Sequence, residues 1–159
     1  MLLRSIVTGT LCAVRYDQPI RTDRSFRDTL HQETGDKIRV LIVDDSRAIL
    51  DFMSRAFNSR QGIEVIGSAT NGAQAVAMSE DLRPDVVIMD VEMPTMDGLE
   101  ATRRIKRAHS AIVVVLVSGS ADLLASSVSA GADGYISKPF TADALICRVM
   151  GNFGITGTQ

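Results

Sequence analysis

The chain has 159 residues and a formal net charge of −2; 45% of the residues are hydrophobic and only 4% are aromatic. This length fits one domain, and the small net charge gives no electrostatic reason to expect nucleic acid or a membrane surface as a direct partner. Cys12 and Cys147 belong to no Cys/His cluster, which argues against a disulfide framework or zinc site and favours the reducing cytoplasm.

The first 36 residues differ in character from the rest. They contain five Arg against five Asp or Glu and show no sustained hydrophobic period. We interpret 1–36 as a flexible N-terminal extension, 37–154 as one domain and 155–159 as a C-terminal tail. Because the strand pattern is complete without residues 1–36, we expect this extension to be dispensable for the chemistry of the domain.

From Ile38 onward, short apolar runs alternate with segments of helical periodicity. Short apolar runs bounded by turn residues predict buried strands. The predicted strands are 38–43, 63–66, 86–90, 111–117 and 135–137, and the predicted helices are 46–60, 71–82, 99–108, 122–130 and 141–153. This alternation indicates an α/β fold, a doubly wound five-stranded parallel sheet with helices on both faces.

The pattern also predicts helix caps and packing faces. Ser46 and Thr141 are suited to cap the first and last helices. Cys147 is interpreted as a core residue, and the basic run 103–107 as a solvent-facing helix surface. On the first helix, the apolar residues that recur at helical spacing are Ile49, Phe52, Met53, Ala56 and Phe57.

Residues able to carry chemistry stand at the ends of four predicted strands. They are Asp44, Asp45, Asp90, Ser118 and Lys138. In an open parallel sheet the carboxyl ends of the strands face one crevice, which is where such folds bind ligands. The sequence therefore predicts three carboxylates, one hydroxyl and one ammonium group within a small volume.

Three neighbouring carboxylates favour a bound cation. Two like charges 4 Å apart repel by roughly 4 kcal/mol at an effective dielectric constant of about 20. Mg²⁺ relieves such repulsion, because it prefers oxygen ligands and keeps water positions that a phosphate can take. The chemistry that this set suits is phosphoryl transfer, in which one carboxylate attacks phosphorus while Lys and Ser bind the phosphoryl oxygens.

Four segments match, in order and spacing, the motifs of a known family. Between Ile38 and about Phe153, the chain resembles a response-regulator receiver domain of bacterial two-component signalling. The resemblance implies a flavodoxin-like receiver fold with strand order 2-1-3-4-5. The stretch 90–100 is also similar to the receiver half of chemotaxis methylesterases. The matching segments are Val43-Asp44-Asp45-Ser46, 89–98 (MDVEMPTMDG), Val117-Ser118-Gly119 and 134–140 (GYISKPF).

The resemblance implies an acceptor and a metal site. The phosphoacceptor of the family falls on Asp90, and its acidic pair falls on Asp44 and Asp45. The Mg²⁺ ligands would be the carboxylates of Asp44, Asp45 and Asp90 and the main-chain carbonyl of Glu92. Of the acidic pair, Asp45 is the one expected to bind the ion directly beside Asp90.

The resemblance also implies a switch. The hydroxyl and the lysine of the family fall on Ser118 and Lys138, and its switch aromatic, whose ring turns inward on phosphorylation, falls on Tyr135. The Lys138–Pro139 bond is expected to be cis, which an X-Pro bond tolerates at small cost.

The expected function is that of a phosphoacceptor in a two-component phosphorelay, a signalling receiver rather than an enzyme. The expected partners are a histidine kinase or phosphotransfer protein and an unidentified downstream protein. A dimer that forms on phosphorylation is a further possibility. One rival function is that of a phosphohydrolase of the haloacid-dehalogenase type, whose Asp-x-Asp motif would begin at Asp90, although Glu92 stands in place of its second Asp. The sequence is also compatible with a receiver detached from a methylesterase or DNA-binding output domain, and with an interaction module whose acidic pocket is silent.

Overall fold

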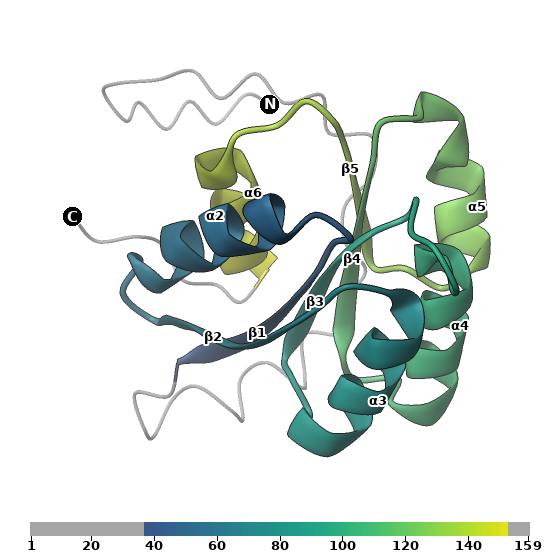
Figure 1. Ribbon diagram of the computed structural model, residues 1–159, viewed down its shortest axis with the longest axis horizontal. Coiled ribbons are helices and arrows are strands. Elements are labelled where there is room, and N and C mark those ends of the chain that lie inside the picture. The colour runs from purple at the N-terminus through teal and green to yellow at the C-terminus, as the bar shows by residue number, and fades with distance from the viewer. Residues whose placement is uncertain (1–36, 153–159) are drawn as a thin grey trace, which may run out of the picture.

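The structure is a computed structural model of the chain, and it describes residues 37–152 (Figure 1). The predicted N-terminal extension 1–36, the C-terminal tail 155–159 and Phe153 lie outside the described residues. The elements, in chain order, are β1 (Ile38–Val43), α2 (Arg47–Asn58), β2 (Ile63–Ala69), α3 (Gly72–Leu82), β3 (Val86–Asp90), α4 (Gly98–Ala108), β4 (Val113–Ser118), a 3-10 turn (Ala121–Leu123) leading into α5 (Leu124–Ser129), β5 (Gly134–Ser137) and α6 (Ala142–Asn152).

The five strands form one parallel sheet in the order β2-β1-β3-β4-β5, which confirms the predicted architecture and strand order. β3 lies at the centre, and all five of its residues are buried. The register between β1 and β2 shifts at Val40 and Leu41, which leaves Ile66 as an extra residue in β2. Because every strand points the same way, their carboxyl ends meet at one edge of the sheet.

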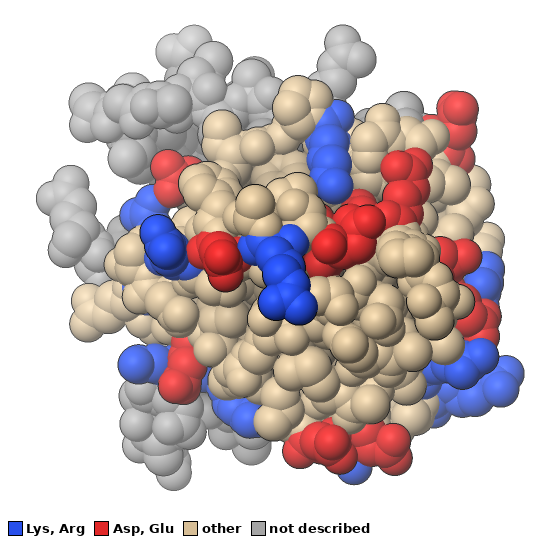
Figure 2. Space-filling view, in the orientation of Figure 1, with Lys and Arg blue, Asp and Glu red and all other residues tan. Residues whose placement is uncertain are grey.

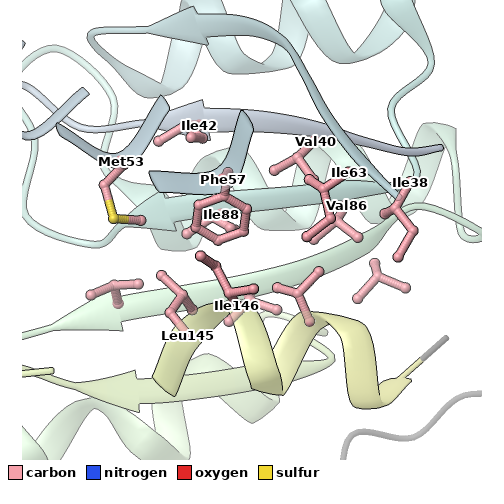
Figure 3. Packing of buried hydrophobic residues seen from close by; sticks show 14 of the residues in the cluster. Ile38, Val40, Ile42, Met53, Phe57, Ile63, Val86, Ile88, Leu145 and Ile146 are labelled. Carbon is pink, nitrogen blue, oxygen red and sulfur yellow. The ribbon is translucent and has the colours of Figure 1, made fainter. Parts of the chain in front are cut away.

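Helices cover both faces of the sheet and close two separate cores. Figure 1 shows α2 and α6 on one side and α3, α4 and α5 on the other. On the α2 and α6 side, the fully buried Phe57 lies in one cluster with Ile88 and Ile146 (Figure 3). On the opposite side, the buried cluster includes Met89 and Leu116. Each large side chain buried in this way contributes about 1.5–3 kcal/mol, so the two layers hold the strand ends rigidly.

The face of α2 that packs on the sheet differs from the predicted one. Leu50, Met53 and Phe57 are buried, whereas Ile49 is 37% exposed and Phe52 is 62% exposed. The prediction was therefore wrong for Ile49 and Phe52. The physical reason is that Leu50, Met53 and Phe57, spaced three and four residues apart, already form a complete stripe, and this stripe takes the inward position.

Ser46 and Thr141 lie at the starts of α2 and α6 as predicted, whereas the predicted place of Cys147 in the core is wrong. Ser46 is the N-cap residue of α2, but its side chain makes no capping hydrogen bond. Cys147 is exposed rather than part of the core, because its neighbours Leu145 and Ile146 occupy the buried side of α6. The Thr141 hydroxyl does accept a hydrogen bond from the Ala144 amide at 3.2 Å, as expected of a residue preceding α6.

Candidate functional site

Two buried carboxylates stand side by side at the edge where the strands end. Asp90 is the last residue of β3, and Asp44 directly follows β1; each is 6% exposed. Val43 pairs with Met89 across β1 and β3, so these acids occupy adjacent positions just beyond that pair. The parallel register thus brings together two acids that are 46 residues apart in the sequence.

Lys138, which follows β5, extends toward both acids. Its Nζ lies 3.2 Å from Oδ1 of Asp90, within hydrogen-bond distance, and 3.8 Å from Oδ2 of Asp44. The Lys138 side chain is 34% exposed, so the ammonium group lies where the buried acids meet solvent. The Lys138–Pro139 peptide bond is cis, as expected.

Ser118 and Tyr135 meet at the loop that follows β4. Ser118 ends β4 and is completely buried, and its Oγ accepts a hydrogen bond from the Ser120 amide at 3.1 Å. Tyr135, on β5, is partly buried, and its hydroxyl donates a hydrogen bond to the Ser120 carbonyl. The backbone of Ser120 therefore connects the two residues, a role that no side-chain pattern could have shown.

Asp45 and Glu92 lie on the solvent side of the site. Both are exposed, whereas the buried Asp44 turns its Oδ1 toward the Ser46 amide, which donates at 2.8 Å. Among residues 37–152, no three acidic, histidine or cysteine side chains gather closely enough to hold a metal ion by themselves. A cation here would therefore need a backbone or water oxygen beside the carboxylates.

The electrostatics of the site centre on Asp90. Burial is the largest influence and raises the pKa of its carboxyl, while the hydrogen bond and charge of Lys138 lower it. The charges of Asp44 and Asp45 raise the Asp90 pKa further, so both neighbouring acids act on the Asp90 carboxyl. Oxygen donors that carry surplus negative charge are the ligand set that Mg²⁺ prefers, so the residues present fit this ion.

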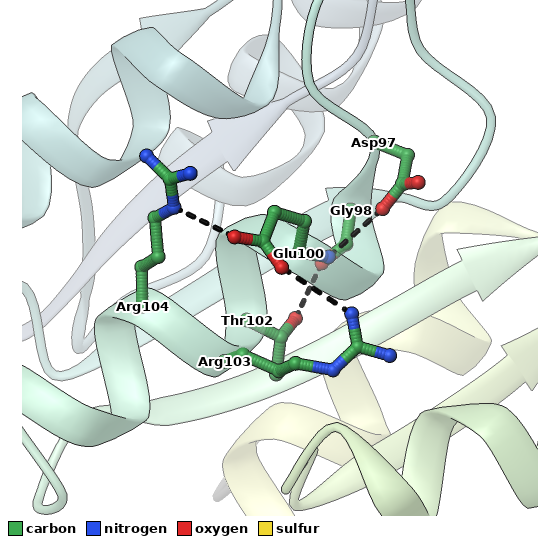
Figure 4. Close-up of polar contacts among 6 residues, drawn as sticks. All are labelled: Asp97, Gly98, Glu100, Thr102, Arg103 and Arg104. Carbon is green, nitrogen blue, oxygen red and sulfur yellow. Dashed lines mark hydrogen bonds and ion pairs between the residues drawn. The ribbon is translucent and has the colours of Figure 1, made fainter.

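The loop after β3 leads into α4 through a capped turn. Asp97 accepts a hydrogen bond from the Glu100 amide at 2.8 Å, and the Thr102 hydroxyl donates to the Gly98 carbonyl at 2.6 Å (Figure 4). Asp97 therefore has the structural role of an N-cap, as its position before Gly98 suggests.

The basic run 103–107 is only partly solvent-facing. Arg103 and Arg104 pair with Glu100 on the surface, but Ile105 is buried. Lys106 is 18% exposed and pairs with Asp133 at 2.9 Å. On the face shown in Figure 2, the described Lys and Arg residues are interspersed with Asp and Glu rather than gathered into one basic area. Within the described part of the chain, no helix is long and apolar enough to cross a membrane.

Comparison with known proteins points to one family. The family model described as the response regulator receiver domain matches residues 40–150. The chain is 39% identical over 110 residues to the chemotaxis protein CheY of Bacillus subtilis, an alignment that covers 68% of this chain and 91% of CheY.

Two further relatives show the range of the similarity. A protein-glutamate methylesterase/protein-glutamine glutaminase of Alkalilimnicola ehrlichii is 42% identical over 108 residues, 65% of this chain but only 27% of the methylesterase. Among solved structures, the CheX-CheY-BeF3-Mg+2 complex from Borrelia burgdorferi superimposes with a TM-score of 0.69 at 30% identity, covering 74% of this chain and 90% of that one. The similarity thus spans nearly the whole of CheY but about a quarter of the methylesterase.

Proposed function

The chain belongs to the response regulator receiver domain family, the signalling domains of two-component systems, and we propose that Asp90 is its phosphoacceptor. The donor would be the phosphohistidine of a histidine kinase or a phosphotransfer protein, and the setting would be the cytoplasm. In this proposal the chain is a signalling receiver rather than an enzyme with a separate substrate.

The observation that carries the proposal is the buried carboxylate of Asp90 with the ammonium group of Lys138 beside it. Asp90 is stripped of most of its water, and Lys138 Nζ lies 3.2 Å from Oδ1. In the transfer, an Asp90 oxygen forms a bond to phosphorus as the bond between phosphorus and the donor nitrogen breaks. Charge spreads over the three equatorial phosphoryl oxygens in such a step, and Lys138 stands where it can bind one of them.

Mg²⁺ is the proposed cofactor. When bound, it would neutralise charge on the transferring phosphoryl group. The residues proposed to hold it are Asp44, Asp45, Asp90 and the main-chain carbonyl of Glu92. Support comes from the charges of Asp44 and Asp45, which raise the Asp90 pKa, and from the BeF3-Mg+2 complex of the related CheY.

The proposed signal leaves through Ser118, Lys138 and Tyr135. Two hydrogen bonds from Ser118 and Lys138 to a charged phosphoryl group would contribute roughly 3–6 kcal/mol. Moving a two-state equilibrium from 1:99 to 99:1 takes about 5.5 kcal/mol, so these two bonds can drive most of a switch. Movement of Ser118 would pull on Ser120, which also holds the Tyr135 hydroxyl.

The surface that would change around Tyr135 is formed by α5, β5 and α6. A downstream protein would bind there, and a second phosphorylated copy is another occupant that the proposal allows.

Labelling with acetyl phosphate tests this function. The chain should form an acid-labile adduct only when Mg²⁺ is present, and Asp90→Asn should abolish the adduct. Asp97→Asn is the matched control, because Asp97 is exposed in the same loop and Asn caps a helix as well as Asp does. Undiminished labelling of the Asp90→Asn protein would overturn the assignment. Steady release of phosphate from substrates without a stable adduct would instead favour a hydrolase of the dehalogenase type.

A further inference from the structure

Backbone hydrogen bonds join the two ends of the loop between β3 and α4 and fix the loop to β4. The Gly98 amide donates to the Val91 carbonyl at 2.9 Å, which joins the two ends of the loop. Val91 is in turn fixed to β4, because its amide donates to the Val117 carbonyl at 2.9 Å. A Cβ atom at Gly98 would overlap the carbonyl oxygen of Asp90, so the start of α4 lies directly against the backbone of Asp90.

The far side of this loop contains a strained residue. Thr95 has φ = 72°, a left-handed conformation that β-branched residues rarely adopt. Next to it, the Met96 amide donates to the Pro94 carbonyl at 2.8 Å in a tight turn. A residue in such a conformation persists only when surrounding contacts hold it there, so the loop needs an external anchor.

Gly72, the first residue of α3, provides that anchor. Its amide donates to the Met96 carbonyl at 3.0 Å. Gly72 is buried, and a Cβ atom at this position would lie 2.6 Å from the Met96 carbonyl oxygen and 2.9 Å from Met96 Cγ. Real Cβ contacts below 3.0 Å are essentially never seen, so no side chain fits here unless the turn moves away.

We propose that Gly72 is a positioning residue for phosphoryl transfer, acting through the loop on the backbone of Asp90. The Gly72 amide holds Met96, which keeps Thr95 in its left-handed conformation. The closed loop transmits this constraint to Gly98, which lies against Asp90. This inference rests on the proposed function, since it assigns Gly72 a part in the same reaction.

The test is the rate of labelling by acetyl phosphate at saturating Mg²⁺ in Gly72→Ala. A misplacement of about 1 Å at a reacting group can slow a reaction on the order of a hundredfold, so we expect a decrease of roughly ten- to a hundredfold. The label should still be confined to one site per chain, because Asp90 remains the acceptor.

A control variant separates positioning from general loss of stability. Gly62→Ala also strains the chain, since Gly62 has φ = 84°, but nothing lies within 4 Å of a Cβ there. It should lower the melting temperature and leave the labelling rate unchanged. A folded Gly72→Ala protein that labels at the unmodified rate would overturn the positioning role of Gly72.

Hydrogen exchange of the unmodified chain tests the same link even if Gly72→Ala does not fold. Beryllofluoride with Mg²⁺ should slow exchange of the Gly72 and Gly98 amides together, because both belong to one constrained unit. A slower Gly98 amide with an unchanged Gly72 amide would refute the coupling. Failure of the unmodified chain to take any label would refute the proposed function instead, and exchange measured without ligand would still show whether the two amides open together.

Discussion

Replacing Asp90 by Asn should make the metal-free protein more stable at neutral pH, although it removes the proposed phosphoacceptor. Asp90 is only 6% exposed, and burial is the main reason that its pKa is raised. A raised pKa means that the folded state holds the carboxyl proton more firmly than the unfolded state does. Ionisation at neutral pH therefore destabilises the fold, and Asn keeps the shape of the side chain without the charge.

The magnitude follows from two opposing contributions. The hydrogen bond from Lys138 Nζ at 3.2 Å favours the charged form, and such a bond is worth about 1.5–3 kcal/mol. Burying an ion costs several kcal/mol, and the charges of Asp44 and Asp45 add to that cost. The raised pKa shows that the cost prevails, so we expect a net gain of about 1 kcal/mol, or roughly 3–6 °C in melting temperature for a domain of this size.

Thermal unfolding followed by circular dichroism in EDTA measures this gain. Well below the unfolded-state pKa of about 3.9, both chains carry a neutral group, so their melting temperatures should agree. The difference should grow as the pH rises and be complete above the raised pKa of the folded state. Adding Mg²⁺ should reduce it, because the ion stabilises the unmodified chain more than the variant.

The control for this experiment is Asp97→Asn, which removes an exposed carboxylate and keeps a good N-cap, so its melting temperature should not change. An Asp90→Asn protein less stable than the unmodified chain at pH 7 in EDTA would refute the reasoning. It would show that the ion pair with Lys138 outweighs the burial of the Asp90 carboxylate.

Three further outcomes are expected. Thr95→Gly should raise the unfolding free energy in urea by about 0.5–1 kcal/mol, because the left-handed cost to Thr exceeds the entropy that Gly adds to the unfolded chain; an unchanged urea midpoint would mean that Thr95 is not strained. Asp133→Asn should lower stability by about 1–3 kcal/mol, because it leaves the largely buried Lys106 without its carboxylate. Glu100→Gln on the surface should change stability much less, because solvent screens its pairs with Arg103 and Arg104. Beryllofluoride with Mg²⁺ should shift backbone amide resonances across 118–145, and shifts confined to the loop after β3 would place the output elsewhere.

The predicted fold and the positions of the strand-end residues followed from local patterns. The strand 38–43 was predicted with its observed limits, and β3 ends at Asp90 as expected. Short apolar runs that alternate with helices and end in turn residues are compatible with few sheet topologies. The family resemblance supplied the strand order. Once the sheet is parallel, residues at the strand ends must share one edge, which is why Asp44, Asp90 and Lys138 could be brought together from the sequence.

The tertiary structure decided which side chains are buried and which backbone groups meet. Spacing on α2 was compatible with an inward Phe52, but packing against the sheet selected Leu50 and left Phe52 exposed. Asp44 and Asp45 are adjacent and chemically alike, yet only Asp44 is buried, because successive residues at a strand end point in different directions.

Contacts between backbone atoms could not be predicted from any sequence pattern. The bond from Gly72 to the Met96 carbonyl joins segments 24 residues apart and uses an amide and a carbonyl that almost every residue possesses. The link from Tyr135 through Ser120 to Ser118 likewise passes through main-chain groups. The sequence by itself determined the fold and identified the acids, the hydroxyl and the lysine of the site. Both follow from local properties of the chain, namely the hydrophobic period and the chemistry of each side chain. Only the tertiary structure decided how the loops around Asp90 are held, because that depends on distances between backbone groups that the folded chain alone creates.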